Sequence, residues 1–178
     1  MIDMAIVPQP RRPIHSPGVP ARRWPTRIYP GTLEQASWVR ADLRADLHQL
    51  TTLARETTEA MVLCASEMFA NAVDHTRSGT DPDGRVIRTL TAASQERVRV
   101  EIIDDGHRSD GPRSPAVPRE RSLEEWAEAE RGRGLLLIDH LATAWGTRQV
   151  VDFPFCEGLG TVTWAEFAFS TELSGCAR

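Results

Sequence analysis

Apolar positions along the chain follow two different periods. Between residues 33 and 76 they recur at steps of three and four, as in amphipathic helices, and between 85 and 104 they alternate with polar residues, as in half-buried strands. The pattern predicts helices over 33–50, with Thr32 as N-cap, and about 53–76, followed by a turn-forming run at 77–84. It predicts strands over 85–92 and 97–104, joined by a turn at 93–96. The apolar faces expected in the core are Leu33, Ala36, Val39, Leu43, Leu47 and Leu50 in the first helix and Ala60, Met61, Cys64, Met68 and Ala72 in the second.

The flanking regions carry further elements. We expect a short edge strand at 24–29 between two prolines, a third helix over 134–146, and closing strands at 147–153 and 160–169. The polar, proline-rich stretch 106–131, with a helical turn at 123–126, predicts a loop of a length that is usually functional or disordered. The expected organisation is a flexible arm rich in proline and arginine at 1–23, one domain at 24–172 and a tail at 173–178.

The order of these elements decides the fold class. Consecutive strands favour antiparallel pairing, and three helices suffice to cover one face of a sheet. The prediction is an α+β fold, a two-layer α/β sandwich in which a mixed, mostly antiparallel sheet carries three main helices on one face. A doubly wound parallel sheet is not expected.

Composition and charge exclude several classes of protein. Hydrophobic residues make up 40% of the 178 positions and charged residues 26%, the balance of a folded globular protein. The net charge of −4 gives no reason to expect direct nucleic-acid binding. No apolar run is long enough to span a bilayer and no signal-peptide pattern is present, so that we expect no membrane association and a cytoplasmic location. The isolated cysteines 64, 156 and 176 form no zinc or disulfide motif.

The chain contains no lysine, and all 21 of its basic residues are arginine. A P-loop needs a lysine that reaches the phosphates of the nucleotide, and Schiff-base chemistry needs a lysine amine. Both are therefore excluded, and a nucleotide site in this chain requires another architecture.

Glu67, Asn71 and His75 are spaced by four residues and therefore share one stripe of the second predicted helix. This stripe borders the apolar positions, which places it at the rim of the core. A carboxylate there can act as a general base, an amide oxygen can bind Mg²⁺, and an imidazole can reach a phosphate. By itself, such a stripe is more often a solvated helix face.

Two strand ends carry groups suited to adenine. Asp104 ends a predicted strand, where its carboxylate can accept a hydrogen bond from an amino group, and Gly106 lets a ligand approach the backbone closely. Thr161 begins the last predicted strand, and its hydroxyl can assist adenine recognition. Taken singly, each of these positions also fits an ordinary turn.

The start of the third predicted helix has the features of a phosphate site. Gly132 and Gly134 expose backbone N–H groups, and the N-terminus of a helix attracts phosphate. Arg131 or Arg133 can add a bidentate contact to a phosphate. A flexible hinge at the helix entry is the alternative for these glycines.

Four short motifs follow one another along the chain: E-x-x-x-N-A-x-x-H, D-x-G, G-x-G-L and G-T-x-V. Together they resemble the N box and the three glycine-containing boxes of the GHKL ATPase superfamily. More narrowly, the chain resembles the anti-sigma-factor serine kinases related to RsbW and SpoIIAB, in the short single-domain form frequent in actinobacteria. The resemblance covers about residues 24–170 and implies the Bergerat fold, with ATP and Mg²⁺ as cofactors.

The resemblance also implies roles for the matching residues. Asn71 would bind Mg²⁺, Asp104 would hold the adenine amino group, and Glu67 would be the general base for a serine hydroxyl. Gly106 would begin a lid that closes over the phosphates at Gly132. The implied ATP-binding set is Asn71, His75, Asp104, Gly106, Arg131, Gly132, Arg133, Gly134, Leu135 and Thr161.

The implied function is an ATP-dependent protein serine kinase of the anti-sigma-factor type, which phosphorylates a small anti-anti-sigma partner of the STAS type. A sigma factor would be a second partner, and the first helix would mediate a homodimer. The chain departs from the family at Arg108, where many members have a second glycine, and in its long, proline-rich lid. These departures keep open a catalytically weak or inactive ATP-binding module that regulates a partner by binding alone.

Two other classes fit less well. A detached histidine-kinase catalytic domain would follow a helical hairpin with a phospho-acceptor histidine, but His48 lies in the first helix of the domain itself. A small-molecule hydrolase would need a nucleophile beside a base, and no such arrangement stands out.

Overall fold

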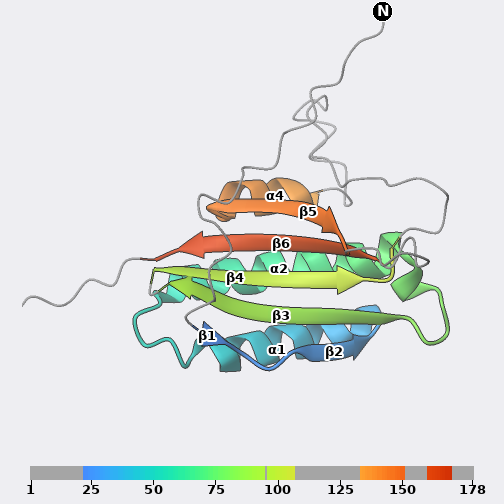
Figure 1. The fold of residues 1–178 in the computed structure, drawn as a ribbon, viewed down its shortest axis with the longest axis horizontal. Coiled ribbons are helices and arrows are strands. Elements are labelled where there is room, and N and C mark those ends of the chain that lie inside the picture. Colours follow the sequence, from blue (N-terminus) through green and yellow to red (C-terminus); the bar gives the residue numbers. More distant parts are fainter. Residues whose placement is uncertain (1–21, 95, 107–132, 151–159, 170–178) are drawn as a thin grey trace, which may run out of the picture.

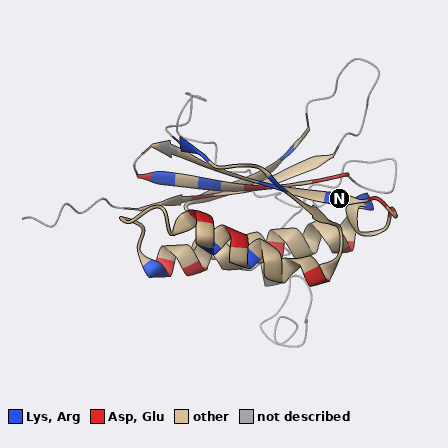
Figure 2. Cartoon of the chain, turned by 90° about the horizontal axis from the view of Figure 1, so that it is seen from below, with Lys and Arg blue, Asp and Glu red and all other residues tan. Residues whose placement is uncertain are grey.

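The computed structural model describes residues 22–94, 96–106, 133–150 and 160–169. These residues form a two-layer α/β sandwich in which the helices lie on one face of a six-stranded sheet (Figure 1). Figure 2, which views the molecule from below, shows the helices as one layer and the sheet as the other. The α+β fold class is therefore confirmed. Every strand pair in the described ranges is antiparallel, whereas a mixed sheet was expected.

The elements follow the expected order. The strands are β1 (Arg22–Arg23), β2 (Arg27–Pro30), β3 (Arg85–Ser94), β4 (Arg97–Asp104), β5 (Ala144–Gln149) and β6 (Thr161–Ala168). They are arranged as β1-β3-β4-β6-β5, and β2 pairs with β3 on the same edge as β1. The helices are η1 (Leu33–Gln35), α1 (Ala36–Leu47), α2 (Arg55–His75), η2 (Arg77–Gly79) and α4 (Arg133–Leu141), where η denotes a 3-10 turn.

Three details near the N-terminal edge differ from the prediction. The edge strand expected at 24–29 is β2, at Arg27–Pro30, and Arg22 and Arg23, which were expected in the flexible arm, form β1. Trp24, between the two strands, donates its backbone N–H to the carbonyl oxygen of Leu90 at 3.1 Å. Thr32 precedes a 3-10 turn and makes no side-chain capping hydrogen bond. Leu33 was expected in the core but is 50% exposed, because the helical period begins only after this turn, at Ala36.

The third helix is shorter than predicted, because it ends at Leu141. Trp145 and Gly146, which were expected in this helix, belong to β5 and pair with Ala165 and Trp164 of β6. Pairing with β6 begins just after the helix, where the backbone N–H of Thr143 donates to the carbonyl oxygen of Glu166 at 2.9 Å. Tertiary pairing has thus overridden the local helical pattern.

The core lies between the sheet and the three helices. Its largest fully buried apolar side chains come from both layers: Val39, Leu43, Leu47, Met61, Val62, Met68, Phe69, Val86, Leu90, Ile102 and Ile138. The alternation along β4 turns Val98, Val100 and Ile102 toward this core, and Asp104 follows in the same phase. A carboxylate is therefore buried at the helix-facing end of an apolar strand.

The same layer contains a buried ion pair. Nη2 of Arg88 in β3, which is fully buried, lies 2.5 Å from Oδ2 of Asp46 in α1, which is 4% exposed. Arg27 of β2 adds a longer contact, 3.9 Å from Oδ1 of Asp46. The pair joins the first helix to the sheet.

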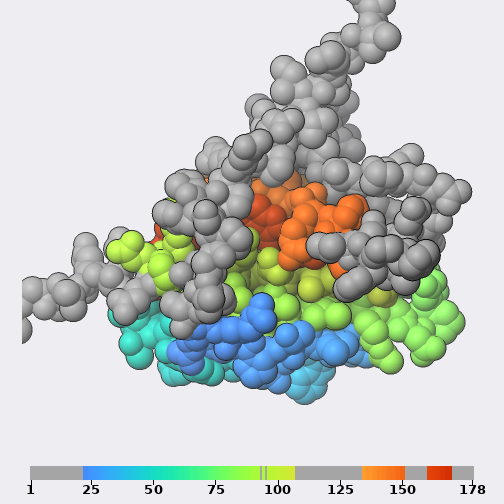
Figure 3. Space-filling view, in the orientation of Figure 1, coloured from blue at the N-terminus to red at the C-terminus, as the bar shows by residue number. Residues whose placement is uncertain are grey.

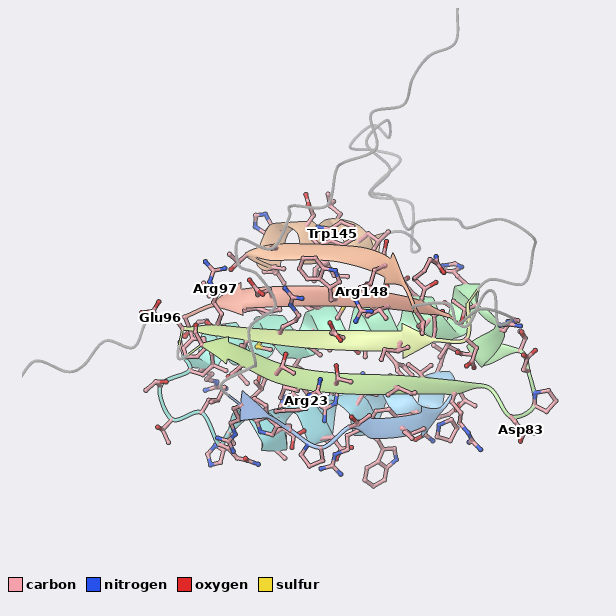
Figure 4. The ribbon with its side chains drawn as sticks, in the orientation of Figure 1. Arg23, Asp83, Glu96, Arg97, Trp145 and Arg148 are labelled. Atoms are coloured by element: carbon pink, nitrogen blue, oxygen red, sulfur yellow. The ribbon has the colours of Figure 1, made fainter. Side chains whose placement is uncertain are left out.

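The face of the sheet turned away from the helices carries charged side chains. Figure 3 shows the described part of this face, from β1 and β2 in blue to β5 in orange. Arg97 and Arg99 of β4 both donate to Glu166 of β6 at 2.9 Å, and Arg148 of β5 lies 3.4 Å from Glu101 (Figure 4). These pairs cross-link three neighbouring strands.

Several expectations concern residues outside the described ranges. The arm up to residue 21, the loop at 107–131 with its helical turn, and the tail at 173–178 all belong to this group. Within the described part of the chain, no helix has the length and hydropathy that a membrane span requires.

Candidate functional site

The stripe Glu67, Asn71 and His75 lies on the rim of α2, as its spacing predicts. Glu67 and Asn71 are half-buried and His75 is exposed, whereas the neighbouring Cys64 and Met68 are buried. At 1.5 Å per residue, the stripe extends about 12 Å along the helix. Because α2 packs against α4, β4 and β6, the stripe runs along the junction of these elements.

One end of this stripe meets the beginning of α4. A Cβ atom at Gly134 would lie 2.6 Å from Oε2 and 3.2 Å from Cβ of Glu67, so that only a glycine allows this approach without displacing the carboxylate. Gly134 is the second residue of α4. The Glu67 carboxylate therefore lies beside the N-terminus of a helix, where backbone N–H groups favour negative charge.

Asp104 lies on the other side of the site, where β4 ends and β6 begins. It is 7% exposed and lies opposite Thr161 in the register of the two strands. Its Oδ1 accepts hydrogen bonds from the backbone N–H groups of Gly106 at 2.7 Å and of Thr161 at 3.3 Å. Gly106 has a φ of 77°, a left-handed conformation that favours glycine. The turn thus directs its own N–H back to the carboxylate.

The segment after α2 binds this turn tightly. Nε and Nη2 of Arg77 donate to the carbonyl oxygen of Asp105 at 2.9 and 2.6 Å, and the backbone N–H of Arg77 donates to the carbonyl oxygen of Gly106 at 2.8 Å. The Ser78 hydroxyl accepts from the backbone N–H of Asp105 at 2.9 Å. The sequence did not predict the contacts of Arg77, Ser78 and Asp105, because 27 or 28 positions separate the partners and no motif links them.

These groups gather at one end of the sheet. In Figure 4, Asp83 and Glu96 mark opposite ends of the sheet, and β4 ends and β6 begins on the Asp83 side. Asp104, Gly106 and Thr161 are together there, while Glu67 and Gly134 are in contact farther along α2. The structure therefore brings five predicted residues into two contacting groups, linked by α2.

The remaining predicted residues have different placements. Leu135 is partly buried and packs against the core. Arg133 is the first residue of α4, and Arg131 and Gly132 lie outside the described residues. Their predicted contacts with phosphate stay predictions.

The chemistry of the site favours binding and positioning over thiol nucleophilicity. Burial, with a smaller contribution from the Glu67 carboxylate, raises the pKa of Cys64 to about 12, so that this thiol stays protonated at neutral pH. Among the described residues, no group of three or more His, Cys, Asp or Glu side chains is arranged to hold a metal ion. The amide of Asn71 suits Mg²⁺, which needs few protein oxygens when phosphates supply others.

Comparison with known proteins agrees with this arrangement. Residues 29–151 match the family described as the histidine kinase-like ATPase domain. No curated protein matches the chain in sequence. Among solved structures, the RsbU and RsbW domains of Rv1364c from Mycobacterium tuberculosis are similar, with a TM-score of 0.50 and 20% identity.

That similarity covers 82% of this chain and 33% of the other, so that the chain spans about a third of the length of the solved structure that it resembles. At this identity the likeness concerns the fold alone. The sequence match is more informative, because it covers residues 29–151 of 178 and includes the Glu67 stripe, the Asp104 turn and the start of α4. The chain belongs to the histidine kinase-like ATPase domain family.

Proposed function

We propose that the chain is an ATP-dependent protein serine kinase of the anti-sigma-factor type, acting on a small anti-anti-sigma protein with a STAS-type fold. Membership in a histidine kinase-like ATPase family implies that ATP binds. The observation that carries the kinase proposal is the contact between Glu67 and Gly134, which places a half-buried carboxylate beside the helix N-terminus where phosphates are favoured.

Each part of the site has a role in this proposal. The buried carboxylate of Asp104 accepts from the adenine amino group, with the Thr161 hydroxyl beside it. The amide oxygen of Asn71 holds Mg²⁺, which neutralises charge on the phosphates when bound. His75, Gly106, Leu135 and residues 131–134 complete the ATP-binding set.

Glu67 acts on the protein substrate. Its carboxylate accepts the proton of the substrate serine as the hydroxyl oxygen attacks the γ-phosphorus of ATP. The bond from this phosphorus to the bridging oxygen breaks, and ADP leaves with the electron pair. Such a transfer depends on positioning and on charge neutralisation, which arginine and Mg²⁺ supply in a chain without lysine.

A second candidate is an ATP-binding module that regulates its partner by binding alone. Arg108 supports it, because this residue stands where many related kinases have a second lid glycine. A sigma factor is a proposed partner under either candidate, and a homodimer is the proposed assembly.

The deciding experiment compares Glu67→Gln with Glu56→Gln, an exposed glutamate on the same helix. Titration with ATP and Mg²⁺ measures binding, and transfer of labelled γ-phosphate to a panel of STAS-type proteins measures kinase activity. We expect Glu67→Gln to keep ATP binding and lose transfer, and Glu56→Gln to keep both. ATP binding by the wild type without labelling of any STAS protein would favour the binding module.

A further inference from the structure

The turn that follows β4 is held by the segment that follows α2. Asp104 can recognise a base only if its carboxylate has a fixed direction, and its Oδ1 takes that direction from the N–H of Gly106 at 2.7 Å. We infer that Arg77 is a positioning residue for nucleotide selection, which acts through the Asp105–Gly106 peptide on Asp104. This inference rests on the proposed ATP site.

The contacts of Arg77 fix two successive carbonyl groups. Its guanidinium donates twice to the carbonyl oxygen of Asp105, and its backbone N–H donates to the carbonyl oxygen of Gly106. The Asp105 carbonyl belongs to the same peptide group as the Gly106 N–H. A guanidinium that fixes this oxygen therefore also fixes the direction in which the N–H points toward Asp104.

The Asp105 side chain fixes the turn from a second direction. Its Oδ2 accepts from the backbone N–H of Arg85 at 3.0 Å and lies 3.0 Å from the Ser78 hydroxyl, which also accepts the backbone N–H of Asp105. Hydrogen bonds from both η2 and the start of β3 therefore hold the chain where it leaves β4. Small rotations of the Asp105–Gly106 peptide are therefore opposed on two sides.

The residues on either side of Arg77 are buried and hydrogen-bonded. Ser78 is 1% exposed and Thr76 is 5% exposed. The Thr76 hydroxyl donates to the carbonyl oxygen of Ala72 in α2 at 2.5 Å and accepts the backbone N–H of Ser78 at 3.2 Å. Arg77 therefore lies between two buried residues that are connected to the end of α2 by hydrogen bonds. The position of this helix thus determines where Arg77 holds the turn after β4.

Base selection is the property most sensitive to this arrangement. A carboxylate acceptor favours the 6-amino group of adenine and opposes the 6-oxo group of guanine, and a fixed buried acceptor rejects the wrong partner more strongly than a mobile one. Loss of the Arg77 guanidinium should therefore weaken ATP binding and reduce the preference for ATP over GTP. Phosphate and Mg²⁺ contacts should be affected less.

The test measures ATP and GTP affinities for the wild type, Arg77→Met and Arg77→Lys. The matched control is Arg44→Met, which removes an exposed arginine paired with Glu59 on the helix layer. Since charge-assisted hydrogen bonds of this kind contribute on the order of a tenfold change in an equilibrium constant, we expect Arg77→Met to bind ATP about tenfold more weakly, with a smaller loss for GTP. Arg77→Lys should recover part of the selectivity, and Arg44→Met should behave as the wild type.

A double-mutant cycle separates positioning from general stability. If Arg77 acts through Asp104, adding Arg77→Met to Asp104→Asn should cause little further loss of ATP affinity. Full additivity of the two losses, or unchanged ATP and GTP affinities in a folded Arg77→Met or Arg77→Lys protein, would overturn the inference while leaving the ATP site intact. Failure of the wild type to bind ATP would overturn both proposals.

Discussion

The backbone of Gly134 in α4 lies directly against the carboxylate of Glu67 in α2. A Cβ atom at position 134 would be 2.6 Å from Oε2 of Glu67, closer than nonbonded carbon and oxygen atoms can remain. The nearest clash is with the far end of a flexible side chain, so that the carboxylate can move aside without unfolding the helices. The contact therefore couples the proposed base to the helix at which the phosphate site is proposed.

Gly134→Ala should separate catalysis from stability. Alanine favours a helix over glycine by about 0.5–1 kcal/mol, which offsets the local crowding, so that we expect little change in melting temperature. Displacement of the Glu67 carboxylate should lower phosphoryl transfer by at least about tenfold, because a misplaced general base forfeits much of its contribution. Transfer assays and thermal unfolding of the same preparation check both parts. A stable variant with full transfer activity would remove Glu67 from the catalytic role.

Asn71→Ala should remove the effect of Mg²⁺ on ATP binding. In the wild type we expect ATP to bind more tightly with Mg²⁺ than without it, because the Asn71 amide would hold the metal and the metal would neutralise charge on the phosphates. In the variant the ATP affinities with and without Mg²⁺ should become equal. The control Asp74→Asn changes an exposed residue about one helical turn farther along α2 and should keep the difference. Calorimetric titration with and without Mg²⁺ measures this. An undiminished Mg²⁺ effect in Asn71→Ala would place the metal elsewhere.

The fold was largely predictable because its two periods are clear in the sequence. Alternation in β4 and the three-and-four spacing of α1 and α2 located these elements closely, since a half-buried strand and an amphipathic helix each require one apolar face. Trp145 and Gly146 were wrongly predicted as helical, because their strand partners, Ala165 and Trp164, belong to β6 and come about twenty positions later in the sequence.

The candidate site likewise has a part that the sequence predicted and a part that it did not. The Glu67 stripe was predictable because its members share one helix, so that spacing alone aligns them. The bond from Arg77 to Asp105 was not predictable, because it depends on how the end of α2 packs beside the end of β4. The residues proposed to bind ATP carried a recognisable motif, whereas the residues that we infer to position them did not.

Asp46→Ala should destabilise the fold without changing ATP affinity. It would leave the fully buried Arg88 guanidinium without its carboxylate partner, and removing one member of a buried ion pair costs about 3–5 kcal/mol. For a domain of this size, that corresponds to a fall in melting temperature of about 10 °C.

The control is a double variant, Asp46→Leu with Arg88→Met, which replaces both charges by apolar side chains and should recover much of the loss. Urea unfolding measures the free energies of unfolding, and ATP titration tests the separation from the nucleotide site. A single variant as stable as the wild type would show that the pair contributes nothing to the fold.

The buried thiol of Cys64 should make stability fall in alkaline solution. Its pKa is raised from 9.0 to about 12, chiefly by burial, so that the folded protein keeps a proton that the unfolded chain releases above pH 9. The stabilisation is therefore complete below pH 9 and is lost as the pH rises toward 12. Between pH 8 and pH 10, linkage predicts a loss of about 1.4 kcal/mol from this group.

Cys64→Ala should lose that much less stability over the same interval, although the variant is less stable at both pH values because the substitution leaves a small cavity. Tyr29, whose pKa burial also raises, contributes equally to both proteins, so that the difference between the two urea-unfolding series isolates the thiol. Parallel stability curves for wild type and variant would contradict the raised pKa.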